Sequence, residues 1–273
     1  MKLFAVYLIF ILASLTQATE LTPNEIFEYA DTFKCNDKFP HHSFCKAVEF
    51  KPWTEEERMV FENILTELDR PELQHFYESI KDKGITKFHR VSYAASWYPN
   101  HRLRRTQFSR KQDKVLLWVD PVTKVIGVMD QFFTSTEFMD PYAKVSRKTL
   151  NILHELAHVY DVANDHISSK SNISKLARWY WDGKRHAING LDYDEVLTHF
   201  NKILGHVKDK DSARAYSEDR RLGVKYGFPT IYSMMNSHEC FAELVSYYIL
   251  DPQAKHYLSE EIQQELDKIL NIR

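Results

Sequence analysis

The pattern of apolar and polar positions predicts a helical beginning to the chain. Capping-box sequences at Thr22–Glu25 and Thr54–Glu57 predict helices over "NEIFEYADTFK" and "EEERMVFENILTEL". A third helix is expected from Pro71 to Lys83, and Gly84 would end it. These elements form a helical N-terminal segment, for which residues 19–85 are the expected bounds.

The middle of the chain changes to strand-forming residues. Three segments, "TKFHRVSYAASWY", "KVLLWVD" and "TKVIGVMD", are rich in β-branched and aromatic side chains. The turn signal Asp120-Pro121 between the last two predicts a hairpin. A small mixed sheet is therefore expected just before the next helix.

Helical spacing returns after the sheet. Apolar residues recur through "TLNILHELAHVYD", and Ser146 is the expected N-cap of that long helix. Further helices are predicted around "KLARWYWDG", "DYDEVLTHFNKIL", "NSHECFAELVSYYIL" and "SEEIQQELDKIL", with a solvated, charged linker over Val207–Arg221. Trp179–Trp181 are expected to pack in the core rather than to line a pocket. The fold class is α+β, with residues 86–273 as one domain.

The first 18 residues have the form of a secretory signal peptide. Lys2 precedes an apolar run from Leu3 to Leu15, and a small-x-small site predicts cleavage after Ala18. The alternative is an uncleaved anchor, but the run is shorter than the roughly 20 residues that span a bilayer. We expect a secreted protein without stable membrane insertion, extracellular, or periplasmic if the host is bacterial.

The composition narrows the classes of partner. Hydrophobic residues make up 44% of the chain, which is typical of a folded globule, and the formal net charge is -2. This charge gives no global field for gathering nucleic acid or anionic membrane. The basic run from Arg102 to Lys111 is interrupted by polar residues and is expected to be a solvated loop rather than a polyanion site.

Export makes the cysteines informative. Cys35 and Cys45 lie in one proline-containing segment and favour a disulfide in an oxidising compartment. Cys240 falls within an apolar helical pattern and is expected to be buried. Asn172 begins an "NIS" sequon, which is a glycosylation acceptor only in a eukaryotic host.

The candidate chemistry lies in "HELAH". Residues at i and i+4 share one helix face, so His154 and His158 can converge on one zinc ion. Glu155 stands beside them as the candidate general base, which would explain a charge in an apolar helix. The alternative is a pair of structural histidines.

A catalytic zinc site typically uses three protein ligands, so a third is required. The continuation HExxHxxGxxH fails, because Asp161 and Asn164 occupy the positions that need Gly and His. His166 lies eight residues beyond His158, without a recognised spacing. Glu239 and Glu243, four apart on another predicted helix, are the remaining choice; alone they could equally be a solvent-facing ladder.

At these residues the chain resembles the zinc peptidase domain of the anthrax lethal factor-like family, which includes the Pro-Pro endopeptidases. "HELAHVYD" is similar to that family's HExxHxxD, and Tyr232, Glu239, Phe241, Ala242 and Glu243 fit its Y-x(6)-E-x-F-A-E segment. One departure is Ser233, where the toxin has Gly. The resemblance covers about the last half of the chain.

The resemblance implies a zincin-like metallopeptidase domain, with the small sheet packed on the active-site helix and one zinc ion per chain. It implies His154, His158 and Glu239 as ligands, Glu155 as base and Tyr232 as oxyanion donor. Asp161 and Glu243 would orient a ligating histidine. His238 is expected to point elsewhere, because adjacent helix positions do not share a face.

The function expected from these residues is that of a monomeric, secreted zinc metalloendopeptidase that acts on a peptide or protein substrate. The substrate would pair with an edge strand, for which Val125–Met129 is the candidate. Two alternatives remain: a zinc-holding binding protein without turnover, and a zinc hydrolase of a non-peptide amide.

Overall fold

The structure is a computed structural model that describes residues 21–38, 45, 48–94, 116–120, 123–135, 137–183, 186–208 and 212–272. The predicted signal peptide and the basic run from Arg102 to Lys111 lie outside these residues. Among the helices that are described, none is both long and apolar enough to cross a membrane.

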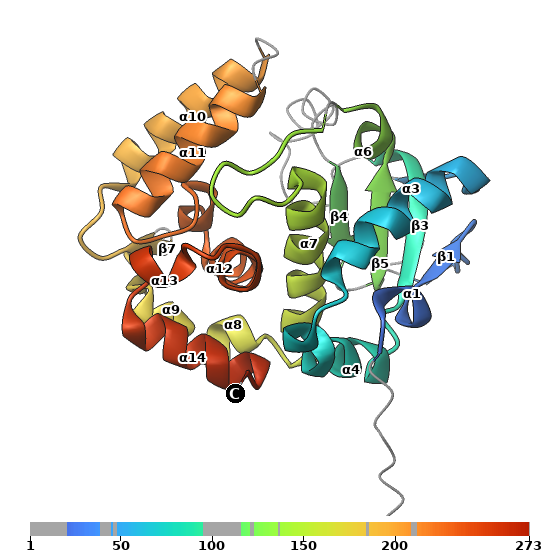
Figure 1. The fold of residues 1–273 in the computed structure, drawn as a ribbon, viewed down its shortest axis with the longest axis horizontal. Helices are drawn as coiled ribbons and strands as arrows, with labels where there is room; N and C mark the ends of the chain where they lie inside the picture. Colours follow the sequence, from blue (N-terminus) through green and yellow to red (C-terminus); the bar gives the residue numbers. More distant parts are fainter. Residues whose placement is uncertain are drawn as a thin grey trace, which may run out of the picture.

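A mixed sheet forms one side of the molecule (Figure 1). Within the described residues its strands follow the order β1-β3-β5-β4, and β2 pairs with the C-terminal part of β3. The pairs β1–β3 and β3–β5 are parallel, whereas β2–β3 and β4–β5 are antiparallel. The hairpin of β4 and β5 is therefore confirmed. The strands are β1 (Glu28–Ala30), β2 (Val48–Phe50), β3 (Lys87–Ala94), β4 (Leu117–Asp120) and β5 (Val125–Met129).

Helices cover the sheet and build the other side of the molecule, which gives an α+β fold (Figure 1). The first part contributes α1 (Pro23–Ile26), α3 (Glu55–Leu65), η1 (Thr66–Leu68), η2 (Pro71–Leu73), α4 (Gln74–Asp82) and α6 (Asp130–Thr134). The second contributes α7 (Arg147–Ala163), α8 (Ile167–Lys170), α9 (Ile173–Leu176), α10 (Tyr193–Lys208), α11 (Ser212–Lys225), η4 (Tyr232–Met234), α12 (Ser237–Leu250), α13 (Ala254–Tyr257) and α14 (Glu260–Leu270), with a small hairpin of β6 (Trp179–Trp181) and β7 (His186–Ile188).

Helix α7 joins the two sides. One hydrophobic cluster runs from Phe88 and Ile126 of the sheet, through Leu153 of α7, to Phe241 of α12, and these four side chains are fully buried. Burial of such a side chain contributes about 1.5–3 kcal/mol. Because α7 lies between the sheet and α12, its exposed turns are few and its position is fixed from both sides.

Strand β5 is central, which corrects the prediction that it forms the edge. All five of its residues are buried, and it pairs with β3 on one side and β4 on the other. An unbroken apolar run such as "VIGVM" is typical of a strand covered on both faces. Gly127 within it lies under the Trp118 indole, since a Cβ there would come within 2.3 Å of that ring. The outer strand of this pair is β4.

Two predicted helices are wrong over part of their length. The capping box at Thr22 starts a single turn, and Glu28–Ala30 then pairs with β3 as a strand. The segment "KLARWYWDG" divides into α9 and the strand β6, whose Tyr180 and Trp181 are exposed rather than packed in the core. Successive aromatic residues favour a strand, and here this preference outweighed the helical pattern on which the prediction was based. The expected boundary at residue 85 falls between β1 and its partner β3.

The predicted linker over Val207–Arg221 is wrong at both ends, because α10 extends to Lys208 and α11 begins at Ser212. Its Arg220 is fully buried, between the carboxylates of Asp140 and Asp251 and beside the Tyr247 ring. A buried charge is tolerated when it is paired in this way. The helices expected at Ser146, Thr54 and Pro71 are confirmed, as is the Cys35–Cys45 disulfide. Cys240 is buried, as expected.

Candidate metal centre

Helix α7 carries both histidines of the HExxH sequence on one face. Ser146 caps the helix by accepting a hydrogen bond from the Thr149 N–H at 3.0 Å. One turn separates His154 from His158, and their ring centroids lie 4.8 Å apart. The two imidazoles converge, as residues at i and i+4 on a helix can.

Helix α12 brings a carboxylate to them. Asn236 caps this helix, because its side-chain oxygen accepts hydrogen bonds from the N–H groups of His238 at 3.0 Å and Glu239 at 2.9 Å. Glu239 thus lies in the first turn, where the helix dipole favours a negative charge. Since α12 packs against α7 (Figure 1), Glu239 meets histidines that are 81 and 85 residues earlier in the chain.

Three donor atoms form a nearly equilateral triangle. The Nε2 atoms of His154 and His158 lie 3.0 and 3.2 Å from Glu239 Oε2, and 3.1 Å from each other. Ligands placed tetrahedrally at about 2.0–2.1 Å from an ion are separated by about 3.3 Å. The donor set therefore fits a single metal ion, and this largely buried group could hold one.

Charges in this cluster interact strongly. Burial would raise the pKa of Glu239, but hydrogen bonds from His154 and His158 hold it well below its usual value. Burial would likewise lower the pKa of His154, but Glu239 and Glu243 raise it well above its usual value. A proton and a cation compete for the same lone pairs, so metal binding here must release a proton.

Glu243, one turn beyond Glu239, supports the far side of His154. Its Oε1 lies 2.8 Å from His154 Nδ1, a close charge contact whose angle departs from that of an aligned hydrogen bond. The hydroxyl of Thr230 donates to the other carboxylate oxygen at 2.6 Å. A carboxylate at Nδ1 favours the tautomer whose Nε2 lone pair faces the triangle.

Ser233 closes the turn that carries Thr230. Its N–H donates to the Thr230 hydroxyl at 3.0 Å, and its own hydroxyl accepts from the Thr230 N–H at 3.2 Å. Both residues are buried. Ser233 therefore helps to fix the support of Glu243.

Glu155 is half-buried beside the two histidines. Burial raises the pKa of its carboxyl, and the charges of His154 and His158 oppose this rise without cancelling it. The backbone of Val119 in β4 lies close enough to this carboxylate to favour its charged form. A carboxylate with a raised pKa is a stronger base than an ordinary one.

The register of the hairpin explains why Val119 can reach Glu155. The Met129 N–H donates to the Leu116 carbonyl at 2.9 Å, so backbone groups of every second residue of β4 face β5. Val119 is one of the alternate residues of β4, whose backbone N–H and C=O groups face away from β5. The outer edge of β4 is thereby directed at α7 and Glu155.

Tyr232 lies on η4, next to the triangle. Its ring centroid is 5.9 Å from that of His154 and 5.9 Å from that of Phe200, on which it stacks. Burial and the nearby Glu239 raise the pKa of its hydroxyl well above the usual value, so the group stays a proton donor. Asp219 holds this segment by accepting hydrogen bonds from the N–H groups of Ile231 at 2.8 Å and Tyr232 at 3.3 Å.

Asp161, which was expected to orient a ligating histidine, faces other residues. Its carboxylate accepts from the N–H and hydroxyl of Ser168 at 2.7 and 2.8 Å and lies 3.3 Å from His238 Nδ1. Within the described chain, its hydrogen bonds do not include the two histidines of the triangle. Hydrogen bonds from Ser168 and His238 outweigh burial and lower its pKa.

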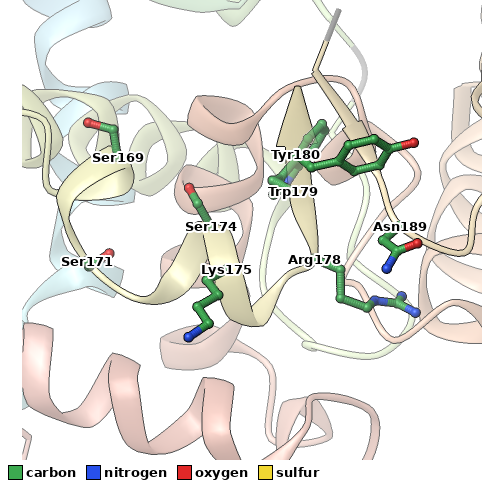
Figure 2. A pocket seen from close by; sticks show the side chains of 8 residues that line it. All are labelled: Ser169, Ser171, Ser174, Lys175, Arg178, Trp179, Tyr180 and Asn189. Carbon is green, nitrogen blue, oxygen red and sulfur yellow. The ribbon is translucent and has the colours of Figure 1, made fainter. Parts of the chain in front are cut away.

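An open pocket of about 720 Å³ lies elsewhere, along α8, α9 and the β6–β7 hairpin. Figure 2 shows hydroxyl, basic and aromatic side chains around it, and none of the triangle residues lines it. The lining residues are Ser169, Ser171, Ser174, Lys175, Arg178, Trp179, Tyr180 and Asn189.

No family model, curated protein or solved structure matches this chain.

Proposed function

We propose that this chain is a zinc-dependent metalloendopeptidase with a zincin-like fold, similar to the anthrax lethal factor-like family. The triangle of His154, His158 and Glu239 donors is the observation that carries the proposal, because two imidazoles and one carboxylate are a usual donor set for catalytic zinc. The supporting contact from Glu243 also matches the way proteins orient a ligating histidine.

Zinc bound there would supply Lewis acidity, which polarises a scissile carbonyl and makes water nucleophilic near neutral pH. The half-buried Glu155 would take the proton of the attacking water and later deliver it to the leaving amine. The Tyr232 hydroxyl, kept protonated by its surroundings, would donate a hydrogen bond to the oxyanion that forms at the carbonyl.

The substrate would lie extended beside β4. This strand is the outer one of the hairpin, and the backbone groups of Leu117 and Val119 face away from β5. Main-chain pairing at a strand edge gives affinity that is independent of most side chains. Because the backbone of Val119 lies near Glu155, a peptide beside β4 would pass close to the base.

Export is part of the proposal. The N-terminal signal-like sequence supports it, and the Cys35–Cys45 disulfide is of a kind that persists in oxidising compartments.

The test is metal content and peptide cleavage by the purified chain and two glutamine variants. Wild type should carry about one tightly held zinc and cleave members of a broad peptide library. Glu155→Gln should keep the metal and lose roughly 10²–10⁴-fold in kcat/KM, because proton transfer is removed. Glu72→Gln, an exposed residue on η2, is the matched control and should behave as wild type.

The other outcomes separate the alternatives. Zinc binding without cleavage of any peptide would favour a zinc-holding protein, and cleavage confined to non-peptide amides would favour an amide hydrolase. Undiminished cleavage by Glu155→Gln would refute the assignment of the base. The variant His154→Ala/His158→Ala should lose the tightly held zinc, whereas His75→Ala/His256→Ala should retain it.

A further inference from the structure

A second group of possible metal donors lies just past the triangle. Asp161 is in the last turn of α7, His166 follows that helix, and His238 is in the first turn of α12. One donor atom from each lies within 4.8 Å of the others. The carboxylate is buried, whereas the two histidine side chains are 57% and 52% exposed.

The distances suit a metal ion after small movements. Asp161 Oδ2 lies 3.3 Å from His238 Nδ1 and 4.0 Å from His166 Nδ1. The first distance already equals the separation of about 3.3 Å expected between tetrahedral ligands of zinc. The second would have to shorten by about 0.7 Å, which an exposed imidazole can do by side-chain rotation.

Hydrogen bonds fix the carboxylate of Asp161 in place. Ser168 holds Asp161 through its N–H and its hydroxyl, which also lies 3.1 Å from His238 Nδ1. The ion pairs that Asp161 makes within the described chain are both with imidazoles, which are cations only when protonated. A metal ion would give this buried carboxylate a permanent positive partner.

The backbone shows an independent sign of constraint at this place. Asp165 and His166 both have left-handed conformations, with φ of 56° and 60°. Consecutive non-glycine residues in this region are uncommon, and each adds roughly 1–2 kcal/mol of strain. The turn is held by a 2.8 Å hydrogen bond from the His166 N–H to the Asp161 carbonyl, and the ring centroids of His166 and His238 lie 6.2 Å apart.

We propose that Asp161, His166 and His238 form a second, solvent-accessible site for a divalent transition metal of the zinc class, with water completing its coordination. Imidazole nitrogen and carboxylate oxygen suit zinc, copper and nickel better than calcium or magnesium. The site is independent of the peptidase proposal, and it binds more weakly than the triangle because two of its ligands are exposed.

The test isolates the second site by removing the first. The variant His154→Ala/His158→Ala is titrated with Zn²⁺ by calorimetry and with Co²⁺ by visible absorption, after circular dichroism has shown that it is folded. One equivalent of metal should bind. Adding His238→Ala or His166→Ala to this background should weaken that binding at least tenfold, whereas His256→Ala, the matched control on α13, should leave it unchanged.

Wild type should bind two equivalents of Zn²⁺, and the variant His166→Ala/His238→Ala should bind one. Two results would overturn the proposal: no binding by folded His154→Ala/His158→Ala, or a second equivalent that survives in His166→Ala/His238→Ala. If only the equivalent of Zn²⁺ assigned to His154, His158 and Glu239 fails to bind, the triangle is contradicted and the second site remains supported. The two assignments are therefore tested separately.

Discussion

Arg220 of α11 is a buried cation, and Arg220→Met is predicted to destabilise the fold strongly. Its Nε lies 3.1 Å from Asp140 Oδ2, and it also contacts Asp251 and the Pro229 carbonyl. The guanidinium carbon is 4.1 Å from the centroid of the Tyr247 ring. Methionine fills a similar apolar volume but removes the positive charge, so the two carboxylates lose their shared partner.

The magnitude follows from the burial of these carboxylates. The side chains of Asp140 and Asp251 are 0% exposed, so neither can replace Arg220 by water. Removing one partner of a buried ion pair typically lowers the free energy of unfolding by about 3–5 kcal/mol. For a chain of this size each kcal/mol lowers Tm by about 2–4 °C, so a fall of about 6–20 °C is expected.

Urea unfolding followed by far-UV circular dichroism measures this change, with thermal unfolding as a second readout. Arg221→Met, on the exposed neighbour, is the matched control and should stay within about 0.5 kcal/mol of wild type. Adding Asp140→Asn and Asp251→Asn to Arg220→Met should recover part of the loss, because the unpaired charges are removed. A loss for Arg220→Met no larger than that of the control would refute the reasoning.

Three further predictions concern the site and its surroundings. Glu243→Gln should weaken zinc binding by about 10–100-fold, because the ligating His154 loses its carboxylate partner; competition with a chromophoric chelator measures this, and an unchanged affinity would contradict it. Burial raises the pKa of Asp219 from 3.8 to about 7, so the folded state retains a proton that the unfolded state releases. The destabilising effect of Asp219 is therefore absent below about pH 4 and complete above about pH 7, at most about 4 kcal/mol. The advantage of Asp219→Asn in urea unfolding should grow between about pH 4 and 7 and then stay constant. Reducing the disulfide between Cys35 and Cys45, ten residues apart, should lower stability by about 2–3 kcal/mol, with Cys35→Ser/Cys45→Ser insensitive to reductant.

Local signals in the sequence were sufficient for much of the fold. Capping residues such as Thr54 and Ser146 marked helix starts correctly, because an N-cap interacts with residues only three positions away. The convergence of His154 and His158 likewise follows from the geometry of a single helix. The meeting of α7 and α12 depends on tertiary packing. Elimination left Glu239 and Glu243 as candidates for the third ligand, and the resemblance to a known family singled out Glu239.

The failures have a common physical cause, which is that distant residues decide the local structure. Glu28–Ala30 is a strand because β3 offers it hydrogen bonds, although a capping box precedes it. The charged segment around Arg220 is a buried helix because Asp140 and Asp251 neutralise it. No short-range pattern indicated that Val119, Thr230 or Asp219 would support the site, since each acts on a residue from another element.

The packing of α12 on α7 means that the three metal donors come together only late in the folding of the chain. A growing chain that has just passed His158 still lacks the carboxylate that lies 81 residues ahead, and a misassembled chain keeps the two helices apart. The proposed peptide cleavage would therefore be impossible in a chain whose α12 has not yet packed on α7. Folding of the whole domain, rather than synthesis of the helix with the HExxH sequence, would switch the proposed activity on.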